Sequence, residues 1–286
     1  MITVLIDSHF LGYRAYYTTG HLSHEDKATG IPYGFLWSIL LIAEKFKTNK
    51  FIFFWDSGSW RKKVFPEYKA SRREGTEEEQ KERERIHQQF DYLKESILLR
   101  LGFSCWQVPE MESDDLIAGT IVNHPDKRFV IVSSDNDLYQ LLTKSNVAGM
   151  YDPAKHKLYR AFDFYQEYGI AARDWTIIKC IAGCSSDGVP GVPGVGTKTA
   201  IKYITEKLNP KSKAYRNIVE NPAIVKRNYR LVALPMYTTP IIPLPKSSEM
   251  IFTEVQAEDL FRRLGFESFL KEDIFERWMN FSRGAF

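Results

Sequence analysis

The chain has few of the residues that would cross-link a protein or anchor it in a membrane. Its three cysteines, Cys105, Cys180 and Cys184, give no paired disulfide framework and predict a reducing compartment. No apolar run approaches the ~20 residues that a membrane-spanning helix needs. The N-terminus enters an expected strand at once, with no signal-peptide pattern. We therefore expect a cytoplasmic protein.

A strong excess of one charge is also absent. The chain has 39 Lys and Arg against 36 Asp and Glu, and the formal net charge of +3 identifies no partner. Cys180 and Cys184 are one helical turn apart, but no histidine or further cysteine lies nearby to complete a zinc site, so free thiols are the preferred interpretation. With 286 residues and 44% hydrophobic content, the chain suits one large globular domain or two modest ones.

Three apolar segments have the pattern of buried strands that run into an aspartate. Residues 3–6 precede Asp7, residues 51–55 precede Asp56, and residues 129–132 lead through two serines to Asp135. Short continuous apolar runs are typical of parallel strands that helices cover on both faces. Ligands of an open parallel sheet bind beyond the carboxyl ends of its strands. We expect the three aspartates at one edge of one sheet, where their mutual repulsion calls for a cation between them.

Helical patterns separate these strands. Residues 33–47 have a broad apolar face, and residues 113–122 form a second expected helix with Ser113 as its N-cap. Residues 76–100 indicate one long charged helix. This alternation predicts an α/β fold with a mostly parallel sheet flanked by helices.

A basic insert follows Asp56. Residues 61–73 contain six Lys or Arg against one acid, and their aromatics Phe65 and Tyr68 are interspersed with the cations. Such a segment suits phosphates and unstacked bases of a nucleic acid. The alternative, a solvated helical face, is preferred only for residues 77–85. The cations are Arg61, Lys62, Lys63, Lys69, Arg72 and Arg73.

Beyond residues 170–175 the composition becomes helical around a glycine-rich segment at residues 183–200. Gly191 and Gly196 have the spacing of a nucleotide phosphate loop, but the lysine falls at Lys198 and no strand precedes the loop, which excludes an NTPase. We expect a glycine hairpin between two helices, the second beginning near Thr197. Its amides can hold a DNA phosphate without reading sequence. The expected contacts are Gly191, Gly194, Gly196, Thr197 and Lys198.

Further acids accompany the strand-end aspartates. Helix caps and turns explain each one singly, but their joint occurrence beside apolar strands indicates a metal site. Oxygen ligands without clustered His or Cys favour Mg²⁺ or Mn²⁺. Two such ions about 3.5–4 Å apart would suit phosphodiester hydrolysis. The additional acids are Glu112, Asp114, Asp115, Asp137 and Asp187.

The order of these motifs resembles the flap endonuclease and 5′→3′ exonuclease family, particularly its bacteriophage members and the N-terminal domain of bacterial DNA polymerase I. The resemblance spans about residues 1–205. It implies a PIN-like nuclease core at residues 1–172 with an arch at 57–100, and a helix–hairpin–helix-type region that grips duplex DNA at 173–286 with its glycine hairpin at 188–197. The matching blocks are Asp7, Asp56-Ser57-Gly58 with residues 66–72, and residues 112–115, 134–137 and 186–196.

The resemblance also implies roles for single residues. Lys69 and Arg72 would contact the scissile phosphate, and Tyr68 would stack on a base. Lys69, Arg72, Asp135 and Asp137 would be the catalytic residues. A K⁺ ion would bind carbonyl oxygens of the glycine hairpin, and a phage-encoded protein would act in the host cytoplasm. The first metal site would be lined by Asp7, Asp56, Glu112, Asp114 and Asp115. Asp135 and Asp137 would lie near both ions, and Asp187 would serve the second.

One departure affects the second metal site. The family usually has Gly-Asp where this chain has Gly183-Cys184, so we expect a weak second ion. The leading hypothesis is a metal-dependent nuclease for branched or 5′-ended DNA; the choice among flap cleavage, exonuclease action and removal of RNA primers from hybrids stays open, as do oligomeric state and polymerase or single-strand-binding partners. One alternative is a DNA-binding protein with decayed catalysis. Another is a small-molecule phosphohydrolase with Asp7 as nucleophile, which would need an acid where His9 stands.

Overall fold

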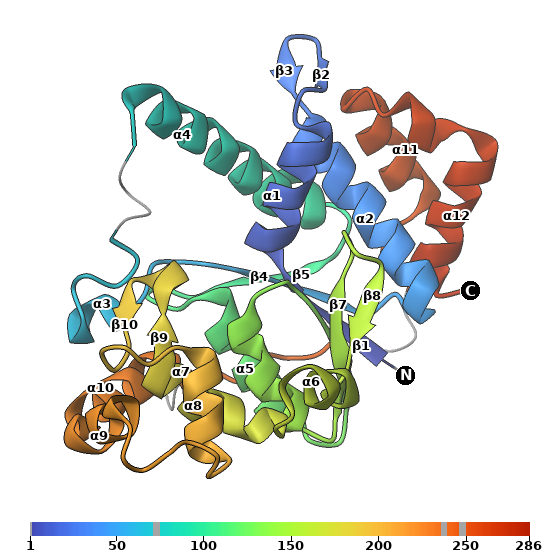
Figure 1. Cartoon of the computed structure of the whole chain (residues 1–286). Helices are drawn as coiled ribbons and strands as arrows, with labels where there is room; N and C mark the ends of the chain where they lie inside the picture. Colours follow the sequence, from blue (N-terminus) through green and yellow to red (C-terminus); the bar gives the residue numbers. More distant parts are fainter. Residues whose placement is uncertain (1, 71–74, 236–238, 246–249) are drawn as a thin grey trace.

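A six-stranded sheet forms the centre of the protein (Figure 1). The computed structural model describes residues 2–70, 75–235, 239–245 and 250–286. The sheet order is β5-β4-β1-β6-β7-β8, and every neighbouring pair is parallel except β7 with β8. The strands are β1 (Ile2–Asp7), β4 (Phe51–Trp55), β5 (Ser104–Gln107), β6 (Arg128–Val132), β7 (Val147–Asp152) and β8 (Lys157–Tyr159).

The three predicted strands are confirmed as neighbours in this sheet. In the parallel register, Ile6 of β1 pairs with Phe53 of β4 and with Val132 of β6. Alternate side chains of β1 enter different cores, since Val4 and Ile6 belong to one hydrophobic cluster and Leu5 to the other. Burial of both faces explains why these strands are continuous apolar runs rather than alternating ones.

Helices cover both faces of the sheet (Figure 1). One cluster of buried side chains joins the sheet to α1 and α2, and the other joins it to α5, α6 and α7. The expected helix at residues 33–47 begins earlier, at Gly30, and Glu112 rather than Ser113 is the N-cap of α5, in a capping box with Asp115. These helices are α1 (Ser8–Thr19), α2 (Gly30–Phe46), α5 (Ser113–Asn123), α6 (Ala161–Tyr168) and α7 (Trp175–Ala182).

The last helices of the chain pack against the first hydrophobic core. Phe261 and Trp278 are buried in the same cluster as Phe35 of α2, and Figure 1 shows α11 and α12 beside that helix. The C-terminal helices therefore complete the hydrophobic core that contains α1 and α2. The helices α8, α9 and α10 instead pack on the α7 side of the protein. The helices are α8 (Thr197–Ile204), α9 (Lys213–Glu220), α10 (Pro222–Val232), α11 (Glu254–Arg263) and α12 (Glu272–Arg283).

A long helix projects from the sheet, as predicted for residues 76–100. Thr76 and Glu79 form a capping box at the start of α4 (Glu77–Tyr92), which continues into the π-helical turn η2 (Leu93–Leu98). Ile86 and Phe90 bury one stripe of α4 against the core. The short helix α3 (Arg61–Val64) lies before it in the chain. Arg72 and Arg73, predicted DNA contacts, lie outside the described residues.

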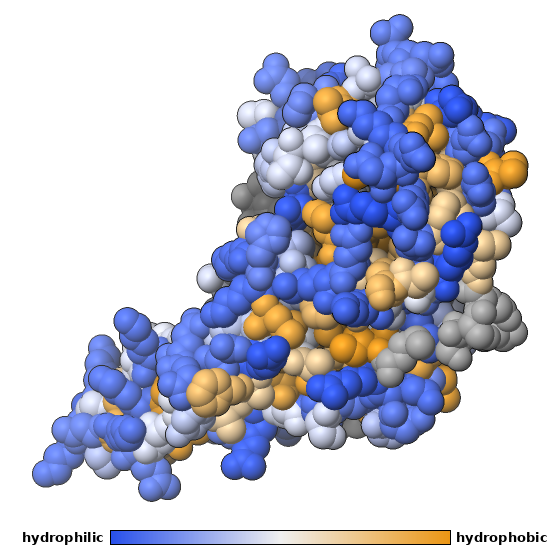
Figure 2. All heavy atoms as spheres, turned by 90° about the vertical axis from the view of Figure 1, so that its right-hand side faces the viewer, coloured by the Kyte–Doolittle hydropathy of each residue, from blue (hydrophilic) through white to orange (hydrophobic). Residues whose placement is uncertain are grey.

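Short elements complete the fold. In the described part of the chain, no helix is both long and apolar enough to cross a membrane. On the face seen in Figure 2, hydrophilic residues cover most of the surface and apolar residues gather toward its middle. The short elements are β2 (Ser23–His24), β3 (Lys27–Ala28), η3 (Asn136–Thr143), η4 (Ala172–Asp174), β9 (Gly183–Cys184), η5 (Ser185–Asp187), β10 (Val189–Pro190) and η6 (Glu267–Leu270).

Candidate active site

A cavity of about 860 Å³ lies at the carboxyl edge of the sheet. All three strand-end aspartates line it, which confirms that they share one edge. Asp114, from the first turn of α5, joins them, and Arg83 and His87 of α4 form part of the opposite wall. We call the four acids that line this cavity on the sheet side the rim cluster. They are Asp7, Asp56, Asp114 and Asp135.

Hydrogen bonds from backbone amides at the starts of α1 and α5, and from two serine hydroxyls, hold the carboxylates of Asp7 and Asp56 in place. Asp7 ends β1 and caps α1, where its Oδ1 accepts a hydrogen bond from the Phe10 amide at 3.2 Å. The Ser113 amide donates to Asp56 Oδ1 at 2.7 Å, and the Ser113 hydroxyl donates to Asp7 Oδ1 at 3.3 Å. The Ser133 hydroxyl donates to Asp7 Oδ2 at 3.0 Å. The sequence analysis gave Ser113 only a capping role and Ser133 none, and did not predict their bonds to these carboxylates, for which the one signal was their position beside the acids.

The electrostatics of the rim cluster favour a bound cation. Burial, followed by the charge of Asp56, raises the pKa of Asp7 to about 7. Burial and the neighbouring Glu112 raise the pKa of Asp114, and burial and Asp137 raise that of Asp135. Burial opposes ionisation of Asp56 as well, but His9 and the Ser113 amide outweigh it and lower the pKa. Crowded oxygen donors that resist ionisation together fit a divalent ion of the Mg²⁺ type.

Arg61, a predicted DNA contact, lies inside the protein instead. Its side chain is 2% exposed, and its guanidinium donates to both oxygens of Asp115 at 2.7 and 2.9 Å and to Glu112 Oε2 at 2.8 Å. The Leu231 carbonyl of α10 accepts a further bond at 2.7 Å. The prediction is wrong because α5 and α10 enclose this part of the insert. Asp115, fully buried, is thus neutralised by Arg61.

Tyr68 is buried as well, so the prediction that it stacks on a base is wrong. Its ring packs with Cys184, Val189 and Leu231, and its hydroxyl lies 3.1 Å from both Glu112 Oε2 and Asp187 Oδ2. A hydroxyl donates to one of these carboxylates at a time.

Lys69 lines the cavity next to Tyr68. Its ammonium forms an ion pair with Glu112 and lies 3.7 Å from Asp187 Oδ1. Burial lowers the pKa of Lys69, but Glu112, Asp114 and Asp187 together outweigh it and raise the pKa, so the side chain stays charged at neutral pH. Of the other cations in the insert, Lys62 is half-buried and Lys63 is exposed and paired with Glu110.

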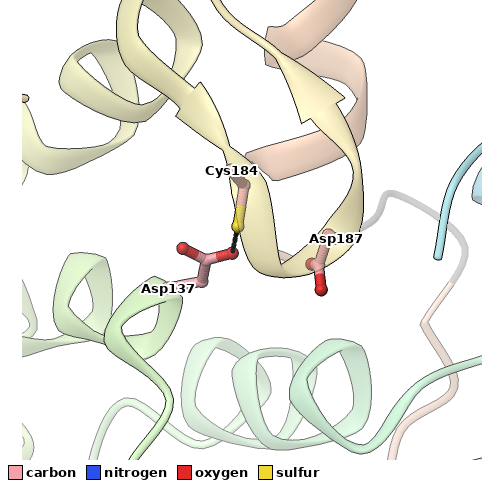
Figure 3. Close-up of side chains that lie close together, drawn as sticks. All are labelled: Asp137, Cys184 and Asp187. Atoms are coloured by element: carbon pink, nitrogen blue, oxygen red, sulfur yellow. Dashed lines mark hydrogen bonds between the residues drawn. The ribbon is translucent and has the colours of Figure 1, made fainter. Parts of the chain in front are cut away.

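A second group of possible metal ligands lies at the tip of the β9–β10 hairpin, which carries Cys184 and Asp187, with Asp137 facing it from below (Figure 3). We call Asp137, Cys184 and Asp187 the hairpin cluster; one ligand atom from each lies within 4.8 Å of the others. The Cys184 thiol points at Asp137, with Sγ 3.5 Å from Oδ2. Burial raises the pKa of Cys184 to about 11, so the thiol is neutral at pH 7. The Lys179 ammonium lies 2.7 Å from Asp137 Oδ1.

The glycine hairpin has its predicted place between α7 and α8, and α8 begins at Thr197. Gly194, Gly196 and Lys198 are exposed at this helix start. Gly191 is different: a Cβ there would lie 2.2 Å from the Ala182 carbonyl carbon, so this glycine permits close packing against α7.

Comparisons with known proteins place this site in a class of α/β nucleases. Residues 2–169 match the family described as "5′-3′ exonuclease, N-terminal resolvase-like domain". The chain belongs to this 5′→3′ exonuclease family. The resemblance seen in the sequence is thereby confirmed, and the small-molecule phosphohydrolase alternative falls away.

Two relatives and one solved structure illustrate the match. A 5′-3′ exonuclease of Bacillus subtilis (strain 168) is 33% identical over 219 residues, covering 71% of this chain and 69% of the relative. A thermostable DNA polymerase I of Thermus caldophilus is 31% identical over 209 residues, covering 71% of this chain but 24% of the polymerase. The flap endonuclease of bacteriophage T5, in a complex with DNA and metal ions, has a TM-score of 0.70 and 22% identity over 97% of this chain and 99% of that chain. The last comparison confirms the predicted fold class.

Proposed function

We propose that this protein is a metal-dependent, structure-specific 5′ nuclease that hydrolyses phosphodiester bonds in branched or 5′-ended DNA. The observation that carries the proposal is the rim cluster, four carboxylates that converge on one cavity with Lys69 at its wall. Membership of the 5′→3′ exonuclease family supplies the reaction class. The flap endonuclease of bacteriophage T5, complexed with DNA and metal ions, supports branched DNA as the substrate.

The rim cluster would hold the principal divalent ion, Mg²⁺ or Mn²⁺, because its donors are hard oxygens. An ion bound there supplies an activated water and stabilises charge on the phosphate. Asp137 and Asp187 would offer carboxylate oxygens to a second ion. Glu112 and Asp115 support the rim from behind: Arg61 neutralises Asp115, and Glu112 is shared by Arg61 and Lys69.

Lys69 would act on the scissile phosphate. Its ammonium is 15% exposed at the cavity wall and is held by Glu112. A fixed cation aimed at the phosphate stabilises charge that develops on the oxygens during hydrolysis, where it lowers the barrier rather than the binding constant. The Ser113 and Ser133 bonds keep the opposing carboxylates oriented.

The duplex would be gripped at the glycine hairpin. Exposed backbone at Gly194 and Gly196, the first amides of α8 at Thr197, and Lys198 together offer phosphate ligands at a helix N-terminus. Backbone carbonyls of the hairpin would also bind a K⁺ ion. Lys62 and Lys63 would contact phosphates of the flap. Because these contacts are to phosphates and not to bases, we expect no sequence specificity.

The competing function is a structure-specific DNA-binding protein with weakened catalysis, which the neutral thiol of Cys184 favours. Incubation with a 5′-flap substrate, a blunt duplex and an RNA–DNA hybrid, each with Mg²⁺ or Mn²⁺ and with EDTA as control, separates the two. Cleavage that requires metal supports the nuclease, and the substrate that reacts fastest identifies its preference. DNA binding without cleavage in either metal would establish the competing function.

A further inference from the structure

Lys179 projects from the end of α7 into the hairpin cluster. Its ammonium lies 2.7 Å from Asp137 Oδ1 and 3.5 Å from Cys184 Sγ, and only 13% of its side chain is exposed. The ordinary pKa of a lysine, about 10.4, keeps this ammonium charged at pH 7. A permanent positive charge therefore sits among the ligands on which a second divalent ion would depend.

The two clusters differ in how much of their charge the fold has already neutralised. In the hairpin cluster, the ammonium of Lys179 pairs with Asp137, and Lys69 lies 3.7 Å from Asp187. Cys184 offers a thiol in place of a third carboxylate. Among the described residues, no Lys or Arg lies within 4.0 Å of a carboxylate oxygen of Asp7, Asp114 or Asp135 in the rim cluster. A divalent ion that binds Asp137 must either displace the ammonium of Lys179 or be repelled by it at contact distance, and both lower its affinity.

We propose that Lys179 is the resident cation of the hairpin cluster, so that this protein holds one divalent ion tightly in the rim cluster and a second only weakly. The proposal rests on the metal dependence of the proposed function and specifies how its two sites differ. Cys184 and Lys179 belong to one arrangement: with a thiol rather than a carboxylate at position 184, the single ammonium of Lys179 balances the charge of Asp137, and no strong divalent site remains.

The test is Mn²⁺ binding to metal-stripped protein without DNA, followed through the electron paramagnetic resonance signal of free Mn²⁺. For the wild type we expect one tight ion and a second that binds at least tenfold more weakly. Lys179→Met should tighten the second ion at least tenfold and leave the first unchanged. Lys179→Arg, which keeps the charge, should bind as the wild type does.

A matched control is Lys127→Met. Lys127 also forms an ion pair with a 2.7 Å contact, to Asp126, but it precedes β6 at the opposite edge of the sheet. Its variant should reproduce the wild-type binding curve. If Lys179→Met does not fold, as judged by its far-ultraviolet circular dichroism, Lys179→Gln replaces it.

The outcomes separate this inference from the proposed function. Two ions of similar affinity in the wild type, or a Lys179→Met curve that superimposes on the wild-type curve, would overturn the role of Lys179 even if the protein cleaves DNA. The expected Mn²⁺ curves in a protein that cleaves none of the substrates would refute the nuclease function and leave the role of Lys179 standing.

Discussion

The rim cluster and the hairpin cluster are neighbouring sets of acids that the fold treats in opposite ways. In the rim cluster, burial and like charge raise the pKa of Asp7, Asp114 and Asp135. Among the described residues, no Lys or Arg lies within 4.0 Å of these three carboxylates, although Arg61 and Lys69 act on Asp114 from farther away. In the hairpin cluster, Lys179 pairs with Asp137, and a neutral thiol stands between the two aspartates. The comparison shows that two neighbouring groups of acids can differ in the positive charge that the fold places among them. Because such a charge repels a cation at contact distance, we expect it to lower metal affinity.

We expect the largest effect on DNA cleavage from a substitution in the rim cluster. Asp135→Asn should abolish cleavage and leave DNA binding in EDTA intact, because Asp135 belongs to the rim cluster and its Oδ1 is held by a hydrogen bond from the Asp137 amide at 2.8 Å. Single-turnover rates on a 5′-flap substrate provide the measurement. Asp126→Asn, in an exposed turn at the other edge of the sheet, is the control. Retention of more than a small fraction of wild-type rate would show that the rim does not need this carboxylate.

The next largest effect is on folding stability and involves Asp115, which lies behind the rim cluster and pairs with Arg61. Arg61→Met should lower the free energy of unfolding by about 3–5 kcal/mol, because it leaves Asp115 buried without a counter-charge. Urea denaturation at pH 7 measures the change, with Lys63→Met as a matched control because its ion pair with Glu110 is exposed. Equal stabilities of the two variants would mean that Asp115 finds another partner.

A pH effect follows from Asp7. Its pKa in the folded protein, about 7, lies above the ordinary value of 3.8, so the folded state binds a proton more tightly than the unfolded state does. The corresponding stability is fully present below pH 3.8 and is lost as the pH rises through about 7. Metal-free protein should thus lose up to about 4 kcal/mol of stability from this group between acid and neutral pH. Denaturation at pH 5 and pH 8 should show a smaller loss for Asp7→Asn, and an unchanged loss would assign the effect to other acids.

Lys69→Ala should reduce the rate of the chemical step about 10²-fold, or ~3 kcal/mol, with little change in DNA affinity. The reason is that Lys69 is one cation among many for attraction but the one at the cavity wall beside Glu112. Single-turnover kinetics and equilibrium binding in EDTA separate the two quantities. Lys63→Ala serves as the control, and a rate for Lys69→Ala equal to that of this control would leave Lys69 as a surface cation only.

The smallest effect is expected in the hairpin cluster. Cys184→Asp should lower the Mg²⁺ concentration for half-maximal activity several-fold, because it adds a hard, charged ligand next to Asp137. Lys179 limits the gain, so the same change in a Lys179→Met background should act more strongly. Cys184→Ser, which adds no charge, is the matched control. Superimposable Mg²⁺ titrations, or a less active aspartate variant, would exclude position 184 from the second site.

The sequence determined the features that depend on local order. Continuous apolar runs before Asp7, Asp56 and Asp135 defined parallel strands and hence one shared edge. The family motifs followed the same order, and the start of α8 at Thr197 agreed with the glycine pattern. These predictions succeeded because the period of a strand and the turn chemistry of glycine act over a few neighbouring residues.

Tertiary structure alone decided which charges meet. Arg61 and Tyr68 had the sequence context of surface DNA contacts, but Leu231, 170 residues from Arg61, and the acids of α5 enclose them. Lys179 gave no signal, because its partner Asp137 lies on η3, in a different part of the chain. Burial of a charge and the distance to its counter-ion depend on how segments remote in sequence pack, and this packing sets whether an acid binds a metal ion or an internal lysine.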